Sequence, residues 1–227
     1  MASREDVRRL AAESIARGDA TGWFDALYQS VEGSWTNVPW VHLAPNPLLV
    51  DLLSSSSCSS ALDASGLTCL VVGCALGDDA EALSAIGFDV TAFDISGTAI
   101  DACRSRFPNS RVEYTVADLF KLTQRWTGRF DLVFEANTLQ VLPSDLRPAA
   151  IRAVATTVAL DGRLLVLCRA RDRAESIGQF PWPLTREELN QFSAHGLIEL
   201  EVECGLDQEI PPVRRFRALY GRPCRFE

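Results

Sequence analysis

Lysine is almost absent from this 227-residue sequence, which carries Lys121 alone and has a formal net charge of −8. A broad cationic surface for nucleic acid would therefore have to come from arginine clusters. The densest cluster is Arg214, Arg215 and Arg217, and alternation along a strand would split it between two faces. We expect these arginines to lie on a solvated strand edge, and we expect no nucleic-acid partner.

Histidines are few, and closely paired cysteines are missing. His42 and His195 are the two histidines, and none of the seven cysteines forms a pair with the two-residue gap of zinc and redox sites. This pattern predicts reduced, mostly buried thiols and no metal site.

Long hydrophobic runs are missing as well. No segment approaches the ~18 uninterrupted apolar residues of a membrane span, and the start of the chain alternates charged with small side chains, unlike a secretory signal. We expect a cytoplasmic protein without a membrane partner, as a monomer or a weak homodimer. The length predicts one domain over residues 1–227, with an N-terminal part at 1–60 and a core at 61–227.

The N-terminal part has the pattern of helices around an ordered loop. Apolar residues at helical spacing predict the helices, and Gly18 ends the first of them. The loop combines prolines with Trp35 and Trp40, which is too rich in proline for a helix and too aromatic for a plain linker. The serine-rich stretch after it is typical of a flexible surface connection. The predicted elements are helices over 4–16, from 19 or 21 to 28, and 48–53, the loop over 33–47, and the connection over 54–60.

From residue 68 onward, apolar runs of strand length alternate with helical patterns. Continuous apolar strands are typical of a parallel sheet covered on both faces, and the repetition requires right-handed crossovers. Asp78 and Glu81 have the spacing of a capping box at the start of one helix. The last two strands, joined without a helix, predict an antiparallel hairpin. The fold class is thus α/β, a Rossmann-like doubly wound sheet of seven strands, mostly parallel with a C-terminal antiparallel hairpin, preceded by an N-terminal helical and loop lid. The predicted strands are 68–72, 88–93, 112–115, 130–135, 163–169, 197–204 and 214–220, and the predicted helices are 78–85, 97–107, 146–160 and 186–195.

Polar or glycine-rich residues follow the first three predicted strands, where a doubly wound sheet binds its ligands. The first strand ends in a turn from Gly73 to Asp79, whose glycines let the backbone approach a ligand, although a tight turn needs glycine without any ligand. Asp94 lies 21 positions after Gly73, where a carboxylate can accept both hydroxyls of an adenosine ribose. Asp118, after the third strand, is placed to accept from an adenine amine. Each aspartate also has a structural alternative, as a helix cap in competition with Ser96 or as a turn residue.

Two kinds of adenosine cofactor fit this pattern, and Asp78 separates them. A dinucleotide site has glycine at that position, where the helix N-terminus meets pyrophosphate, and the charge of Asp78 would repel pyrophosphate. A nucleoside triphosphate site needs a lysine after the glycines, and none is present there. S-adenosyl-L-methionine has no phosphate, and its ammonium and sulfonium groups are positive, so acidic residues near the turn favour it. We expect this cofactor; the alternative from another class is an NAD(P)-dependent oxidoreductase.

Several stretches of the chain resemble the successive motifs of class I S-adenosylmethionine-dependent methyltransferases. The matching stretches are 71–81, 90–96, 116–119 and 130–143. The resemblance implies that the glycine turn lies against the methionyl part and the ribose, that the acid after the second strand binds the ribose, and that the acid after the third faces adenine. These roles fall on Gly73, Gly77, Asp94 and Asp118. Ala75 stands where the family usually has glycine.

A narrower resemblance is to the thiol, halide and thiopurine methyltransferase group. It is carried by residues 35–47, by the Gly-Cys-x-x-Gly-x-Asp turn, and by residues 130–135, where Glu135 replaces the family's usual aspartate. It implies an N-terminal segment whose tryptophans lie over the cofactor. The residues expected to bind the cofactor are Trp35, Trp40, Gly73, Cys74, Ala75, Gly77, Asp79, Asp94, Ile95, Asp118, Leu119, Glu135 and Asn137.

The implied reaction is transfer of a methyl group to a small-molecule acceptor. This is an in-line displacement, so the enzyme must align nucleophile, methyl and sulfur and exclude water. A thiol or similar soft nucleophile needs little more, whereas an oxygen or nitrogen acceptor can need a base. His42 and Glu135 are the candidate catalytic residues; packing within its loop is the alternative for His42, and Glu135 is preferred as the partner of the cofactor's ammonium. A thiol methyltransferase is the first hypothesis, an O- or N-methyltransferase the second, and a cofactor-binding regulator without turnover the third.

Overall fold

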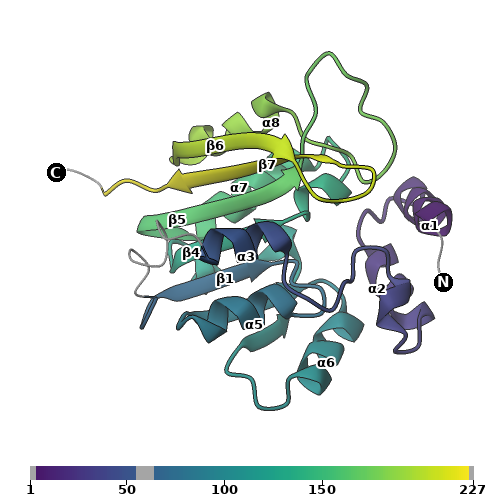
Figure 1. The fold of residues 1–227 in the computed structure, drawn as a ribbon, viewed down its shortest axis with the longest axis horizontal. Coiled ribbons are helices and arrows are strands. Elements are labelled where there is room, and N and C mark those ends of the chain that lie inside the picture. The colour runs from purple at the N-terminus through teal and green to yellow at the C-terminus, as the bar shows by residue number, and fades with distance from the viewer. Residues whose placement is uncertain (1–3, 55–63, 225–227) are drawn as a thin grey trace. The chain divides into compact units, whose positions relative to one another are not determined.

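A computed structural model describes residues 4–54 and 64–224 of the chain (Figure 1). Its strands form a seven-stranded sheet in the order β3-β2-β1-β4-β5-β7-β6. The predicted α/β sheet of seven strands, mostly parallel with a C-terminal antiparallel hairpin, is therefore confirmed, and the lid role of the N-terminal part stays a prediction. The predicted connection over 54–60, with Cys58, lies outside the described residues apart from Ser54.

The chain divides into two compact units, residues 1–67 with 73–118, and residues 68–72 with 119–227. The first unit contains the parallel pair β2 and β3, in which β2 is buried at every position after its first residue. This burial agrees with the continuous apolar run in the sequence. The described elements of this unit are α1 (Arg4–Ala16), α2 (Gly22–Ser30), η1 (Trp35–Asn37), α3 (Pro47–Ser54), α5 (Asp78–Ala85), β2 (Asp89–Asp94), α6 (Gly97–Arg106) and β3 (Glu113–Val116).

The second unit contains the other five strands. β1, β4 and β5 pair in parallel, and β7 joins β5 to β6 with antiparallel pairing on both sides. The described elements are β1 (Thr68–Val72), η2 (Leu119–Lys121), η3 (Gln124–Trp126), β4 (Phe130–Ala136), η4 (Leu139–Val141), α7 (Arg147–Thr157), β5 (Val158–Arg169), α8 (Arg186–Asn190), η5 (Gln191–His195), β6 (Ile198–Leu206) and β7 (Arg214–Gly221).

The predicted capping box at the start of α5 is wrong. The N-cap of α5 is Gly77, in the left-handed conformation and without a side-chain cap. The Asp78 carboxylate instead forms an ion pair with Arg106 at 2.7 Å, and Glu81 accepts a hydrogen bond from the Tyr114 hydroxyl, also at 2.7 Å. Both acids are thus used by tertiary contacts, which sequence spacing does not report.

The predicted helix over 146–160 is wrong at its end, because residues 158–160 belong to β5. Val158 has extended backbone and pairs with Phe130. The pairing of β5 with β4 then shifts in register before Arg163, and a Cβ on the intervening Gly162 would lie 2.9 Å from the Phe130 carbonyl oxygen. A short apolar run at the end of a helix fits helix and strand alike, so periodicity alone could not place this boundary.

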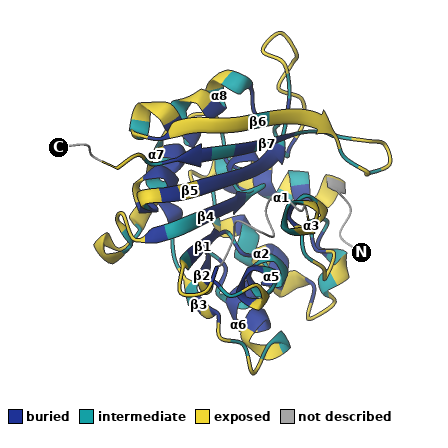
Figure 2. Cartoon of the chain, turned by 60° about the vertical axis from the view of Figure 1, so that its left-hand side comes forward, coloured by how far each residue is buried: buried dark blue, intermediate teal, exposed yellow. Residues whose placement is uncertain are grey.

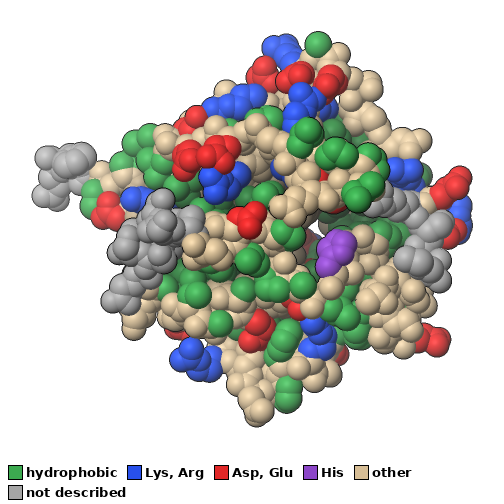
Figure 3. All heavy atoms as spheres, viewed as in Figure 1, with side chains coloured by type: hydrophobic (Ala, Val, Ile, Leu, Met, Phe, Trp, Pro, Cys, Tyr) green, Lys and Arg blue, Asp and Glu red, His purple; other side chains and the backbone are tan. Residues whose placement is uncertain are grey.

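The arginine cluster of β7 does not lie on a strand edge, and that prediction is wrong. The edge strand is β6, which is exposed along nearly its whole length, whereas β7 lies between β5 and β6 (Figure 2). Arg214 pairs with Asp172 at 2.8 Å, Arg215 with Asp207 at 2.6 Å, and Arg217 with a glutamate of β6 at 2.5 Å. On the face seen in Figure 3, basic side chains accordingly lie beside acidic ones.

A buried arginine organises the second unit. Arg147, the first residue of α7, is 1% exposed and forms an ion pair with Glu188 of α8 at 2.5 Å. It also donates to the carbonyl oxygens of Leu142 and Trp182, at 3.2 and 3.0 Å. One guanidinium therefore joins two helix starts and two loops, and without it Glu188 loses its ion-pair partner.

The turn between β1 and α5 contains a strained residue. Gly73, Ala75 and Gly77 all have positive φ, of 63°, 49° and 87°. Glycine adopts these angles freely, and a Cβ on Gly77 would also collide with the Tyr114 hydroxyl. Ala75 adopts the same region against the steric preference of its Cβ.

Replacement of Arg147 by methionine is expected to lower the free energy of unfolding by about 3 kcal/mol, because it leaves Glu188 without its ion-pair partner at a mostly buried position. Urea unfolding followed by circular dichroism measures the change. The matched control is Arg9→Met, whose ion-paired side chain is 65% exposed and whose loss should cost less than about 0.5 kcal/mol. Equal losses in the two variants would contradict this assignment.

Ala75→Gly is expected to raise the free energy of unfolding by about 0.5 to 1 kcal/mol, because glycine relieves the left-handed strain. The control is Ala82→Gly, inside α5, which should lower it by about 1 kcal/mol. The same urea titration measures both. Destabilisation by Ala75→Gly would show that the alanine conformation is not strained.

Candidate functional site

A buried carboxylate lies at the centre of the first unit's ligand-binding edge. Asp94 ends β2 and is 7% exposed. One of its oxygens accepts the amide of Ala75 and the other the amide of Ser96, both at 2.9 Å. Burial raises the pKa of Asp94 to about 6, although these amides and that of Ile95 favour the charged form. The side chain thus fixes the glycine turn and, because each carboxylate oxygen has two lone pairs, keeps acceptor capacity for a ligand.

The competition between Asp94 and Ser96 for the helix cap is settled by the geometry. Ser96 is the N-cap of α6, and its hydroxyl oxygen accepts the Ala99 amide at 3.0 Å. The Asp94 carboxylate lies behind this cap and accepts the Ser96 amide. It is therefore held beside the glycine turn, where ribose binding was predicted for it.

Asp118 comes to the same edge from the neighbouring strand. β2 and β3 are parallel, with Asp94 opposite Val116, and the Ala117 amide donates to the Asp94 carbonyl oxygen at 3.0 Å. Asp118 follows directly and is half-buried, as is Ile95. The carboxyl ends of two adjacent strands thus carry the two aspartates that were assigned to one nucleoside.

Helix α2 docks beside Asp94 through a contact that the sequence did not reveal. Asp25 accepts the Ser96 hydroxyl at 2.6 Å and the Thr98 amide at 3.0 Å, at the N-terminus of α6. These hydrogen bonds lower the pKa of Asp25 although partial burial opposes them. Asp25 looks like any acid in the first turn of a helix, so no local signal identifies it.

Three aromatic side chains of the N-terminal segment, Trp23, Tyr28 and Trp40, pack together. The Trp40 indole nitrogen donates to the hydroxyl of buried Tyr28 at 3.0 Å, and Trp23 meets Trp40 edge-on at 6.0 Å. Burial and the charge of Asp94 raise the pKa of Tyr28. The N-terminal segment therefore lies close enough to the predicted ribose site for the charge of Asp94 to affect Tyr28.

The remainder of the N-terminal loop is tied down by Asp79. Its Oδ1 accepts the Asn46 backbone amide at 2.6 Å, and burial raises its pKa to about 6. Trp35 is half-buried in η1, whereas His42 is exposed. Asp79 was predicted to bind the cofactor, and the structure shows that it holds the loop over 33–47.

The thiol in the glycine turn is not activated. Cys74 is 7% exposed, and the hydrogen bond with Cys103, burial and the charge of Asp94 all raise its pKa. Cys103 donates to the Ala75 carbonyl oxygen at 3.2 Å. A neutral buried thiol is a poor nucleophile, so these cysteines shape the turn.

In the second unit, Glu135 lies at the end of β4 and is fully buried. Its Oε1 accepts hydrogen bonds from the amides of Thr138 and Leu139 at 2.6 and 3.0 Å, while Oε2 is buried and accepts none from the described residues. Burial raises its pKa to about 7. Asn137 has positive φ, 66°, and its Oδ1 accepts from Arg215 at 2.9 Å. Glu135 therefore fixes the turn after β4, with one acceptor left over.

The predicted site residues are divided between the two units. The first unit brings together the glycine turn, Asp94 at the end of β2, Asp118 two residues after β3, and the N-terminal loop. Leu119, Glu135 and Asn137 belong to the second unit, in which Leu119 is buried.

The nucleoside-binding edge suits a cofactor without phosphate. Arg106 from α6 is paired with Asp78 and also donates to the Leu76 carbonyl oxygen, so its charge is not offered to a phosphate. Asp25, Asp79 and Asp94 add negative charge near the turn. Acceptors for hydroxyls and amines, together with negative charge, fit the nucleoside and positive groups of S-adenosylmethionine.

Within the described ranges, no three His, Cys, Asp or Glu side chains are grouped to hold a metal ion. Six cysteines lie in these ranges, all free and four of them buried. None of the described helices has the length and apolar content needed to cross a membrane.

Comparisons with known proteins agree with this geometry. Residues 69–162 match the family model described as a methyltransferase domain. Thiocyanate methyltransferase 1 of Brassica oleracea is 27% identical over 169 residues, which cover 72% of this chain and 66% of that protein, just under two thirds of its length. A protein of Arabidopsis thaliana named "Probable thiol methyltransferase 2" is 24% identical over 212 residues, covering 89% of this chain and 85% of the relative.

A solved structure shows the same fold. The N-methyltransferase NodS from Bradyrhizobium japonicum WM9, in complex with S-adenosyl-L-homocysteine, superposes with a TM-score of 0.67 at 23% identity, covering 87% of this chain and 98% of that one. The chain thus has the fold of a solved methyltransferase, and residues 69–162 are similar to a methyltransferase domain.

Proposed function

We propose that this protein transfers the methyl group of S-adenosylmethionine to a small-molecule acceptor, with a thiol or similar soft nucleophile as the first candidate. The observation that carries the proposal is the buried Asp94 carboxylate, which is fixed by the amides of Ala75 and Ser96 at the carboxyl end of β2. A carboxylate in this position accepts ribose hydroxyls and repels phosphate.

The first unit supplies most of the remaining contacts in this proposal. Asp94 would hold the ribose, Asp118 the adenine amine, and the turn from Gly73 to Gly77 the methionyl part. The unused Oε2 of Glu135 is a buried acceptor that suits the cofactor's ammonium group. When bound, S-adenosylmethionine supplies an electrophilic methyl group.

The state of the candidate bases favours a soft nucleophile. Glu135 is fully buried with Oε1 committed to two amides, and His42 is exposed on the N-terminal loop. Neither is positioned to deprotonate an acceptor that is enclosed away from water. A thiol near neutral pH is partly thiolate and needs alignment and exclusion of water more than a base. The relatives named thiol and thiocyanate methyltransferases support this preference.

Oxygen or nitrogen acceptors are the second candidate, supported by the likeness to NodS, an N-methyltransferase. A nicotinamide-dependent oxidoreductase is disfavoured by the charge of Asp78 and by the engagement of Arg106. A cofactor-binding regulator is distinguished from an enzyme only by an assay of transfer.

The first test is calorimetric titration with S-adenosylmethionine and S-adenosylhomocysteine, followed by transfer assays with thiophenol, hydrosulfide, iodide, a catechol and a primary amine. We expect sub-millimolar binding of both nucleosides, no binding of NAD(P), and the fastest transfer to the thiols. Absence of binding would refute the methyltransferase proposal. Tight binding without transfer to any acceptor would point to the regulator instead.

The affinity for the cofactor is expected to decrease as the pH is lowered below about 6. The ribose hydroxyls bind the charged carboxylate of Asp94, and its pKa of about 6 means that this form is lost as the pH drops through that value. Binding at pH 6 should therefore release protons. The affinity should fall by up to tenfold for each pH unit below 6. Calorimetry in buffers of different ionisation enthalpy measures the proton count. Asp94→Asn should bind more weakly at pH 8 and lose this proton release; unchanged release in the variant would contradict the assignment.

A further inference from the structure

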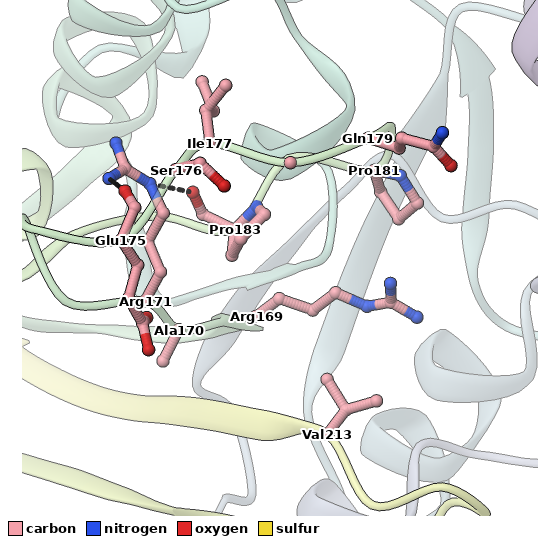
Figure 4. Close-up of a pocket in the computed structure, with 11 residues that line it drawn as sticks. Arg169, Ala170, Arg171, Glu175, Ser176, Ile177, Gln179, Pro181, Pro183 and Val213 are labelled. Carbon is pink, nitrogen blue, oxygen red and sulfur yellow. Dashed lines mark hydrogen bonds between the residues drawn. The ribbon is translucent and has the colours of Figure 1, made fainter.

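The second unit contains a cavity of about 540 Å³ at the carboxyl end of β5 (Figure 4). Its lining includes the apolar side chains of Ile177, Pro181, Pro183 and Val213, together with Arg169. A volume of this size accommodates a small organic molecule. Ligands of doubly wound sheets bind beyond the carboxyl ends of the strands, so the place is suited to the acceptor.

Arg169 is held rigidly at the cavity. It is the last residue of β5, and its amide donates to the Oε1 of buried Gln140 at 2.7 Å. Its carbonyl oxygen accepts the Leu184 amide at 2.9 Å. The side chain is 23% exposed and extends along the cavity between Pro181 and Val213 (Figure 4). The guanidinium is thus presented from a fixed backbone.

The neighbouring charges are committed elsewhere. Arg171 donates to the carbonyl oxygens of Pro183 and Glu175, at 3.3 and 3.0 Å, and so shapes the loop around the cavity. The Glu175 carboxylate is paired with Arg214 and accepts the Asp172 amide. These groups hold the loop that forms the wall, and the apolar side chains of Pro181 and Val213 lie beside the Arg169 side chain (Figure 4).

Glu209 limits the charge that Arg169 can take. Its Oε2 forms a long ion pair with the Arg169 guanidinium, at 3.9 Å, while its Oε1 accepts a hydrogen bond from Arg215. A singly charged ligand group can therefore approach Arg169 more closely than Glu209 does. A doubly charged phosphate would meet stronger repulsion from the same glutamate.

We propose that Arg169 binds a carboxylate on the methyl acceptor, so that the acceptor is a small apolar molecule carrying one such group. This specificity rests on the proposed methyltransferase function. A guanidinium recognises a carboxylate with two parallel hydrogen bonds, and a partly desolvated setting strengthens them. The apolar walls bind the body of the molecule, and Arg169 sets its orientation.

The test compares 4-(methylthio)benzoate with thioanisole, which are the methylated products of two thiols that differ by one carboxylate. Binding of each is measured by NMR titration of the full chain, with and without S-adenosylhomocysteine. We expect the dissociation constant of the carboxylate to be at least about tenfold lower, the scale of a hydrogen bond to a charged group. Arg169→Gln should remove the difference and leave thioanisole binding unchanged. Arg173→Gln, an exposed arginine of the same loop outside the cavity lining, should preserve it.

A second variant guards against misfolding of Arg169→Gln. Ile177→Glu places a negative charge on the cavity wall from a 38% exposed position and should weaken the carboxylate selectively. Equal affinities in the wild-type protein, no binding of the carboxylate, or a preference that survives both variants would overturn the proposal. If the protein binds no S-adenosylhomocysteine but keeps the carboxylate preference, the result would count against the methyltransferase function alone.

Discussion

The hydrogen bonds of the Asp94 carboxylate to the amides of Ala75 and Ser96 are the constraint on which the nucleoside edge depends. Burying a charged group is costly unless donors surround it, and here the donors are the backbone of the turn and of the next helix start. The same contacts that offset this cost also set the path of the glycine turn. Fold and proposed site are therefore not separable at this point: a chain that forms the turn has already oriented the carboxylate proposed to bind the ribose.

Much of this arrangement follows from patterns that are local in the sequence. The continuous apolar run at 68–72 predicts both ends of β1 correctly. Polar groups after each strand predict the ligand-binding edge. The predicted capping box failed because of tertiary contacts. Asp78 and Glu81 had capping spacing but found partners in Arg106 and Tyr114, because a distant arginine and a distant hydroxyl offered better geometry than the helix end.

The docking contacts of the N-terminal segment were also beyond reach of the sequence. Asp25 and Asp79 bind backbone or hydroxyl donors that lie far away in the chain, and every residue supplies such donors, so no residue type announces the pairing. Glu135 illustrates a related difficulty. Its position after β4 was foreseen, yet its complete burial depends on how the following turn folds back over it.

The tether between Asp79 and the N-terminal loop has one more property. The donor is the main-chain amide of Asn46, and its neighbours on both sides, Pro45 and Pro47, have no amide hydrogen to give. A slip of the loop by one residue in either direction would leave the half-buried carboxylate of Asp79 facing a proline. The two prolines thus fix the register of the aromatic loop on Asp79, whatever side chain occupies the position between them.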